Sequence, residues 1–266
     1  MNEKEKLREF EALLTESVKK LIGENEIGIA LSGGLDSSVI AKLAKSFKNK
    51  ITAYVIGIEN SKDFDSAEKA AKEIRIDLKK ILINNKEIEE TIPIIKKILE
   101  DLYMKHKNEI NSEILKPNMI SISFYLPLFF VSKYSKEKNL ISGQGADELF
   151  GGYYRYLKMN KEDAAKEINK DADLLYKFGK LRDLSIAKSF NKNLLMPYLD
   201  EKIIDFCISL PFDLKIKDGQ RKYILRKLGE KIGLSKNISY KEKKAAQYSS
   251  GMLKAIKQIE KAGIRN

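Results

Sequence analysis

The most restrictive feature of this sequence is an eight-residue segment, Leu31-Ser32-Gly33-Gly34-Leu35-Asp36-Ser37-Ser38, which joins two different patterns. Residues 26–31 form a short apolar run typical of a buried strand, and residues 37–47 carry apolar side chains at helical spacing. Glycines between a strand and a helix let the backbone approach an anion closely, while the helix start presents free N–H groups. With its three serine hydroxyls, the segment is predicted to cradle a phosphate.

The acidic residue inside this cradle needs a separate explanation. A Walker A loop carries a lysine at the helix start, but this segment has no lysine and places Asp36 there instead. A carboxylate beside a phosphate is expected only where a cation lies between them, which predicts a Mg²⁺ ion. A simple helix cap is the alternative role for Asp36, and the two roles are compatible.

Strand-like and helix-like segments alternate through the first half of the chain. Further strands are predicted at 51–58, 80–83 and 139–142, and helices at 3–22, 63–74, 87–104 and 119–137. Pro93 and Pro127 are expected to start or kink turns. Because such alternation indicates βαβ units, the predicted fold class is α/β, with a parallel sheet and helices on both of its faces.

The second half of the chain has a different pattern. No strand pattern is convincing beyond about residue 147, and helices are predicted near 161–178, 180–191, 200–209 and 219–231. No linker rich in proline, glycine or serine interrupts the sequence. We therefore expect one domain, residues 1–266, with a C-terminal part that is mostly helical from about residue 155.

A second glycine-rich stretch, residues 142–153, directly follows the predicted strand at 139–142. It contains the adjacent acids Asp147 and Glu148, which cannot share one helix face, so at most one is expected to point at a given metal. Ligands of parallel sheets bind at the carboxyl ends of the strands, which places both glycine-rich loops on one rim. Asp36 and Asp147 are thus predicted to hold Mg²⁺ together, and a solvated, capped turn is the alternative.

Charge and composition limit the partners and the compartment. The chain has 50 Lys+Arg against 38 Asp+Glu, a net charge of +12, which fits either a polyanion such as tRNA or a merely lysine-rich composition. It contains one cysteine, Cys207, predicted to lie in the core, and one histidine, His106, predicted to lie at the surface. No apolar run could span a membrane and the N-terminus is charged, so we expect a cytoplasmic protein.

The first loop resembles the signature of the PP-loop ATP pyrophosphatases, which cleave ATP between the α and β phosphates. The second loop is similar to that of the synthetase domain of asparagine synthetases and of the related β-lactam synthetases. Three further segments carry the resemblance, which extends over about residues 7 to 250: Met196-Pro197-Tyr198-Leu199-Asp200, Lys222-Tyr223-Ile224-Leu225-Arg226 and, weakly, Lys241-Glu242-Lys243.

The resemblance implies a ligase that uses ATP and Mg²⁺, adenylates a carboxylate, releases pyrophosphate and transfers the acyl group to ammonia or another amine. It implies catalytic roles for Lys222, Asp36 and Asp147, with Mg²⁺ held by the two aspartates. The implied ATP and pyrophosphate contacts are Leu31, Ser32, Gly33, Gly34, Leu35, Asp36, Ser37, Ser38, Ile56, Ser142, Gly143 and Lys222.

The acceptor half of the site departs from the family pattern. Asparagine synthetases have a glutamate, thought to take a proton from the attacking amine, where this chain has Gln144, and glutamine cannot act as a base. The glutamate of β-lactam synthetases aligns with about Asn193, and an arginine of asparagine synthetases aligns with Ser123. Gln144, Tyr153 and Asn193 are the candidate residues of an altered acceptor pocket.

The chain also begins directly with the first predicted helix of the synthetase domain, so no glutaminase domain is expected. The nitrogen would then come from free ammonia, a separate glutaminase subunit or a different amine. Two alternative functions stay open. The charge of +12 favours a tRNA-modifying PP-loop enzyme, and the substitutions at Gln144 and Asn193 favour a non-catalytic nucleotide-binding subunit.

Overall fold

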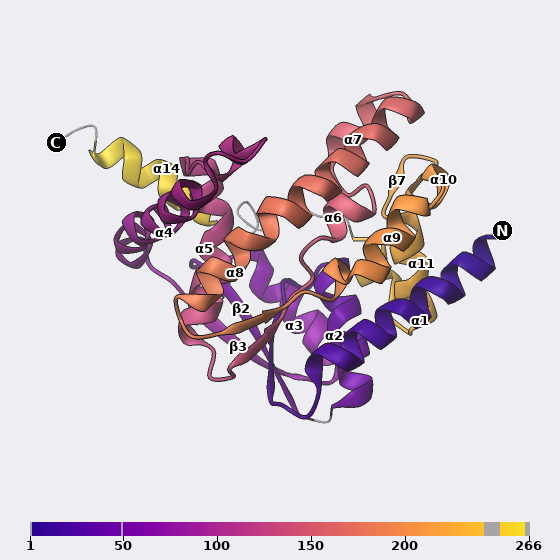
Figure 1. The fold of residues 1–266 in the computed structure, drawn as a ribbon. Coiled ribbons are helices and arrows are strands. Elements are labelled where there is room, and N and C mark those ends of the chain that lie inside the picture. Colours follow the sequence, from indigo (N-terminus) through magenta and orange to yellow (C-terminus); the bar gives the residue numbers. More distant parts are fainter. Residues whose placement is uncertain (1, 49, 242–250, 264–266) are drawn as a thin grey trace.

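A central sheet of five parallel strands organises the protein (Figure 1). A computed structural model describes residues 2–48, 50–241 and 251–263. The strand order is β3-β2-β1-β4-β5. The strands are β1 (Ile27–Ala30), β2 (Ile51–Gly57), β3 (Asp77–Leu82), β4 (Asn139–Ile141) and β5 (Asn193–Leu195). The predicted α/β class with a parallel sheet is confirmed.

The connections between strands place helices on both faces of the sheet. The chain passes from β1 to β2 through α2 (Leu35–Phe47) and from β2 to β3 through α3 (Lys62–Ile74). It then crosses back to β4 through α4 (Asn85–His106) and α5 (Met119–Tyr134). Because such crossovers are right-handed, α2 and α3 cover one face, while α4 and α5 cover the other, where α5 packs on β2. The helix α1 (Glu3–Ile22) packs beside α2.

The strand order reverses between β1 and β4. These two strands are neighbours, with Ile27 opposite Asn139 and Ile29 opposite Ile141. After β1 the chain turns toward one edge of the sheet, and after β4 it turns toward the other. This reversal leaves a crevice at the carboxyl ends of the two strands, where ligands of open α/β sheets bind. Both glycine-rich loops start at this crevice.

Helices of the C-terminal half lie in front of the sheet and to its right in Figure 1, whereas the last helix of the chain lies at the upper left, where it packs on α4. The helices α7 and α8 are joined by one π-helical turn, η3 (Leu175–Gly179), and run on as a single rod. The helices of this half are α6 (Ala146–Leu149), α7 (Lys161–Leu174), α8 (Lys180–Lys188), α9 (Glu201–Ser209), α10 (Phe212–Lys215), α11 (Tyr223–Lys231), α12 (Lys236–Ser239) and α14 (Met252–Gly263). Short 3₁₀ turns are η1 (Ser112–Leu115), η2 (Tyr154–Lys158) and η4 (Pro197–Leu199).

The prediction that no strand follows residue 147 is wrong. β5 joins the central sheet beside β4, and β6 (Ile216–Lys217) forms a hairpin with β7 (Gln220–Arg221). β5 has three residues, too few to show the alternation of apolar and polar side chains that marks a strand in the sequence. It is stabilised by pairing with β4. The hairpin turns at Asp218-Gly219, both with positive φ, a pair typical of tight hairpins, so α11 begins at residue 223 rather than 219.

Helix ends and prolines show how local sequence sets these elements. Six helices (α1, α3, α4, α5, α7 and α9) begin at an Asn, Ser or Asp side chain that accepts a backbone N–H bond. Pro93 and Pro127 lie inside α4 and α5 rather than at turns. Each removes one N–H donor, and packing of the apolar faces holds the helices together despite that loss.

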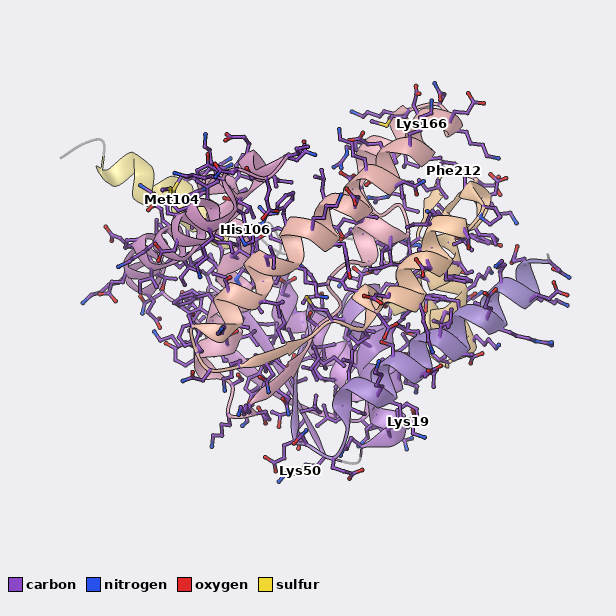
Figure 2. The ribbon with its side chains drawn as sticks, in the orientation of Figure 1. Lys19, Lys50, Met104, His106, Lys166 and Phe212 are labelled. Atoms are coloured by element: carbon purple, nitrogen blue, oxygen red, sulfur yellow. The ribbon has the colours of Figure 1, made fainter. Side chains whose placement is uncertain are left out.

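One cluster of buried apolar side chains extends from Phe10 on α1 to Ile256 on α14 and includes the strands β1, β2 and β4. Cys207 is buried in this cluster, as predicted. His106 is only partly exposed and pairs with Glu109 at the end of α4. Figure 2 labels Lys19 and Lys50 at the lower end of the molecule and Lys166 at its upper end.

Within the described residues no helix is both long and apolar enough to cross a membrane. Of the weakly matching segment at 241–243, only Lys241 belongs to the described part of the chain.

Candidate active site

The first glycine-rich loop leaves β1 and turns directly into α2. Gly33 has a φ of +70°, and an added Cβ there would collide with the backbone of Ser66 on α3, so only glycine fits. The Ser37 hydroxyl accepts a bond from the Ser32 N–H (3.3 Å) and donates to the Gly34 carbonyl (3.4 Å). The loop is therefore held in shape by its own serines.

The start of α2 has no side-chain cap, unlike the six capped helices. Its N-cap residue is Gly34 rather than Asp36, so Asp36 does not play the simple capping role considered above. The first N–H groups of a helix lack partners within the helix, and together with the helix dipole they attract an anion. The phosphate cradle predicted from the sequence thus has an uncapped helix start at its base.

The second loop packs against the first with almost no space between them. An added Cβ on Gly143 would lie 2.8 Å from the Asp36 carbonyl carbon and 2.8 Å from the Ser37 nitrogen. Gly143 is therefore a glycine because the two loop backbones touch there. The neighbouring Ser142 hydroxyl is buried and has no hydrogen-bond partner among the described residues. Such an atom fits a polar ligand, because a buried hydroxyl without a partner is costly.

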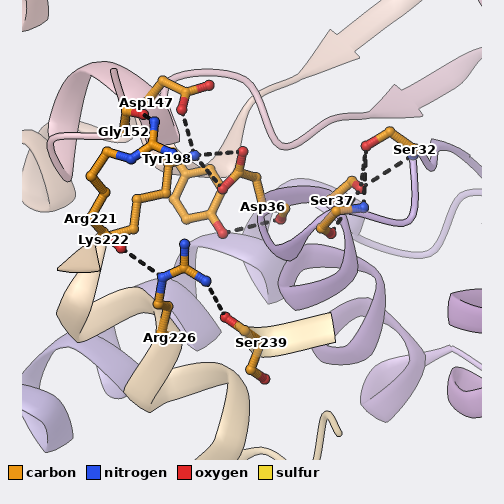
Figure 3. A network of polar contacts seen from close by, with 11 residues as sticks. Ser32, Asp36, Ser37, Asp147, Gly152, Tyr198, Arg221, Lys222, Arg226 and Ser239 are labelled. Atoms are coloured by element: carbon orange, nitrogen blue, oxygen red, sulfur yellow. Dashed lines mark hydrogen bonds and ion pairs between the residues drawn. The ribbon is translucent and has the colours of Figure 1, made fainter. Parts of the chain in front are cut away.

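Asp36, Asp147 and Lys222 meet in one buried cluster (Figure 3). Lys222 Nζ donates to both carboxylate oxygens of Asp36, at 2.7 and 2.8 Å, and lies 2.6 Å from Asp147 Oδ1. Residues 36 and 222 are 186 positions apart in the chain. The lysine that the first loop lacks in the sequence is thus supplied in space by the start of α11. The neighbouring acid, Glu148, points elsewhere and accepts from the Tyr153 hydroxyl at 2.6 Å.

The backbone around Lys222 is held in an unusual conformation. Lys222 has a φ of +58°, in the left-handed region that non-glycine residues rarely adopt. Arg226 Nε donates to the Arg221 carbonyl and its Nη1 donates to the Ser239 carbonyl, both at 2.7 Å, which fixes the chain on each side of α11. Arg221 Nη1 in turn donates to the Gly152 carbonyl at 2.7 Å. These bonds orient the lysine before any ligand arrives.

Two further contacts complete this support. An added Cβ on Gly152 would collide with Asp147 and with the Lys222 side chain, so glycine leaves them room to meet. The buried Tyr198, from the proline-aromatic turn, donates its hydroxyl to the Asp36 carbonyl at 3.2 Å. The two glycine-rich loops and the segments at 196–200 and 222–226 therefore converge on one cluster.

A first cavity of about 170 Å³ opens beside the two loops. It brings together predicted nucleotide residues from the loops after β1 and β4, from the start of α2 and from β2, namely Leu31, Ser32, Asp36, Ser37, Ile56, Ser142 and Gly143. Apolar side chains such as Tyr54, Val55 and Val131 line the rest, a setting suited to an adenine ring. Leu35 and Ser38 are buried behind the loop, and Gly33 faces a separate cavity with Lys69 and Lys72.

The donor set of the cluster fits Mg²⁺ bound with a nucleotide. Among the described residues no group of three or more His, Cys, Asp or Glu side chains could hold a metal alone. Mg²⁺, however, is usually bound by one or two carboxylates together with phosphate oxygens. Asp36 and Asp147 provide two converging carboxylates beside the phosphate cradle, and a cation, the Lys222 ammonium, already lies between them.

Of the three candidate acceptor residues, Gln144 and Tyr153 line one cavity, whereas Asn193 lies elsewhere. Gln144 lines the first cavity and also a second cavity of about 490 Å³, where Tyr153 lies as well. Burial, with help from Glu148, raises the pKa of the Tyr153 phenol. Asn193 is exposed at the amino end of β5 and bonds to Asn139, so its predicted place in the acceptor pocket is wrong. The alignment by motif spacing failed there because it did not anticipate β5.

Sequence reasoning missed Asp183 on α8. It is 1% exposed and lines both cavities beside Gln144. Burial raises the pKa of its carboxyl to about 7, against the lowering effect of neighbouring Arg182 and Gln144. The sequence did carry a signal: Asp183 shares a helix face with Ile186 and Ala187, both buried, so an acid stands on an apolar stripe.

Comparison with known proteins gives one consistent family. The family model for asparagine synthase matches residues 9–195 and 186–262. A Methanocaldococcus jannaschii protein provisionally named asparagine synthetase (glutamine-hydrolyzing) 1 is 32% identical over 289 residues, covering 94% of this chain and 50% of that protein. Asparagine synthetase (glutamine-hydrolyzing) from Gallus gallus is 33% identical over 247 residues, covering 88% of this chain and 41% of that protein. The chain thus spans about half the length of these relatives.

Similarity to a solved structure is weaker. The structure of NMN synthetase from Francisella tularensis aligns with a TM-score of 0.43 and 16% identity, covering 93% of this chain and 77% of that one.

Proposed function

This chain belongs to the asparagine synthase family, and from that premise we propose that it is an ATP-dependent ligase that adenylates a carboxylate and transfers the acyl group to ammonia or an amine. The observation that supports this most is the meeting of Asp36 and Asp147, from the loops after β1 and β4, on the Lys222 ammonium beside the uncapped start of α2. That arrangement matches a site where phosphate charge is held and developing charge is neutralised.

In the first half-reaction, a carboxylate oxygen of the substrate attacks the α-phosphorus of ATP, and the bond to the β-phosphate breaks. The N–H groups at the start of α2 bind phosphate oxygens, and Ser142 donates to the nucleotide from the wall of the first cavity. Asp36 and Asp147 would hold Mg²⁺, which when bound neutralises phosphate charge. Lys222 stabilises the negative charge on the departing pyrophosphate.

We propose that the departing pyrophosphate passes to the other side of the first loop. A third cavity of about 350 Å³ adjoins Gly33 and is lined by Lys69, Lys72 and Lys241. Their positive charges favour a polyanion there.

In the second half-reaction, the nitrogen donor attacks the acyl carbon and AMP leaves. We propose that the nitrogen donor is free ammonia, ammonia released by a separate glutaminase subunit, or an organic amine. We also propose that residues 1–266 work as one unit.

The test is ATP–pyrophosphate exchange with Mg²⁺, first with aspartate and then with a panel of small carboxylates. Exchange that depends on one carboxylate is the expected result, followed by amide formation when ammonium is added. Asp36→Asn should abolish exchange. Asp65→Asn is the matched control, because Asp65 is also in the first turn of a helix but is exposed, and it should exchange as the wild type does.

The two alternative functions give other outcomes in the same assay. Exchange or pyrophosphate release only with bulk tRNA would favour a tRNA-modifying enzyme. ATP binding without exchange, with every carboxylate and with tRNA, would favour a non-catalytic nucleotide-binding subunit.

A further inference from the structure

The second cavity lies beside the first, and the two share part of their walls. Four residues line both cavities: Phe124, Tyr125, Gln144 and Asp183. The second cavity has a volume of about 490 Å³, whereas a small molecule such as water occupies about 30 Å³ in the liquid. It therefore has room for ammonia and equally for an organic amine.

Asp183 is the unusual residue in this wall. Both of its carboxylate oxygens are buried, and neither accepts a hydrogen bond from any described residue. Gln144 approaches it without reaching hydrogen-bond geometry. Buried carboxylates are normally paired or hydrogen-bonded, because water has been removed from them. A ligand that brings N–H groups to this wall would supply the missing partners.

The charged groups around Asp183 do not neutralise it. Arg182, its neighbour on α8, donates from Nη1 to the Ile114 carbonyl at 3.1 Å and lies over the Tyr125 ring. No ion pair between Arg182 and Asp183 occurs in the described part of the chain. Glu148 on α6 faces Asp183 with the same charge, and the Tyr125 phenol on α5 also lies near Asp183. The Tyr153 phenol and the Lys116 ammonium line the second cavity with it.

We propose that Asp183 binds the N–H groups of the nitrogen donor at the boundary of the two cavities and accepts the proton that the donor loses during amide formation. This inference rests on the function proposed above, and it assigns to α8 the base that the second loop lacks at Gln144. Asp183 stands next to Gln144 in the wall of the first cavity, where the acyl carbon would lie.

The step balances in atoms and charge. The neutral nitrogen attacks the acyl carbon of the adenylated substrate, a C–N bond forms, and the C–O bond to AMP breaks. AMP leaves with the electron pair of that bond. One N–H proton passes to the Asp183 carboxylate, which then releases it to solvent through the second cavity. Because burial raises the pKa of this carboxyl to about 7, it can accept and release a proton near neutral pH.

The test measures the two half-reactions separately in the variant Asp183→Asn. This substitution keeps the shape of the side chain and removes the base. The measurements are ATP–pyrophosphate exchange for adenylation and amide formation for transfer, with ammonium or methylamine as the donor. We expect exchange within a few-fold of the wild type and a loss of transfer of about 100-fold or more with each donor the wild type uses. Asp183→Glu should restore part of the transfer.

A matched control and the pH profile complete the test. Asp173 on α7 lines neither the first nor the second cavity, is exposed and pairs with Lys177 at 2.9 Å, so Asp173→Asn should leave both half-reactions unchanged. Wild-type transfer should rise with pH through about 7 and Asp183→Asn should lose that rise.

The outcomes distinguish the inference from the proposed function. Two results would overturn the inference alone: amide formation by Asp183→Asn at the wild-type rate, or an equal loss of ATP–pyrophosphate exchange and amide formation in this variant. No wild-type exchange with any carboxylate would overturn the proposed function and the inference with it.

Discussion

Replacing Lys222 by methionine tests the central cluster in the absence of any substrate. Methionine keeps an unbranched side chain but removes the ammonium that accounts for three close contacts with Asp36 and Asp147. The Lys222 and Asp36 side chains are only 5% and 7% exposed. The two carboxylates would then face each other without a cation, at most two hydrogen-bond lengths apart.

The expected loss of stability follows from this geometry. Removing one partner of a buried ion pair costs about 3–5 kcal/mol. At a separation of about 5 Å and an effective dielectric constant of about 20, the repulsion between two carboxylates is about 3 kcal/mol, which agrees in size. For a chain of this length the change corresponds to a fall in the unfolding temperature of roughly 6–20 °C.

Thermal unfolding followed by circular dichroism, with and without Mg²⁺, measures the effect. Mg²⁺ should raise the unfolding temperature of Lys222→Met more than that of the wild type, because the freed carboxylates offer it a site. Lys227→Met is the matched control on the same helix, where the lysine is partly exposed and pairs with Glu230, so the change should be below about 1 kcal/mol. Unfolding of Lys222→Met at the wild-type temperature, or equal effects of Mg²⁺ on both proteins, would refute the reasoning.

Three other perturbations probe neighbouring features. Gly152→Ala places a Cβ 2.8 Å from the Asp147 Cα and against Lys222, and should reduce ATP–pyrophosphate exchange by about 100-fold, because small displacements of catalytic groups are costly. Ser142→Ala removes a buried hydroxyl that has no partner, so the unfolding temperature should hold while the KM for ATP rises about two- to tenfold in steady-state assays. Asp183→Asn should stabilise the protein at pH 8 but not at pH 4. Burial raises the folded-state pKa to about 7, so wild-type stability falls as pH rises from about 4 to about 7, by a few kcal/mol. Equal effects of this substitution on the unfolding temperature at pH 4 and pH 8 would contradict the burial argument.

The sequence was sufficient for four of the five strands of the central sheet, β1 to β4, and for the position of the two loops. Each loop follows a run of apolar residues, and parallel strands bring their carboxyl ends to one rim, so the meeting of the loops was predictable. The contact at Gly143 was not, because no pattern along the chain states which backbone will touch which. Likewise, the pairing of Asp36 with Lys222 depends on how α11 is placed over α2.

The acceptor side was harder to predict for a physical reason. β5 is three residues long and is stabilised by pairing with β4, so local propensity carries little information about it. Without β5, Asn193 could be placed near the loops, whereas the strand carries it to the opposite rim. Asp183 was overlooked because a charged residue in a helix is usually solvated, and only its spacing with Ile186 and Ala187 indicated burial.

The most direct test of the proposed function is the identity of the products formed from ATP. Phosphorus NMR of the complete reaction, with Mg²⁺, ammonium and the carboxylate that supports exchange, identifies them without labelling. The arrangement of Asp36, Asp147 and Lys222 around the phosphate cradle predicts AMP and pyrophosphate in equal amounts, both absent with Asp36→Asn. ADP and inorganic phosphate as the products would contradict the account, because cleavage would then occur at the γ-phosphate.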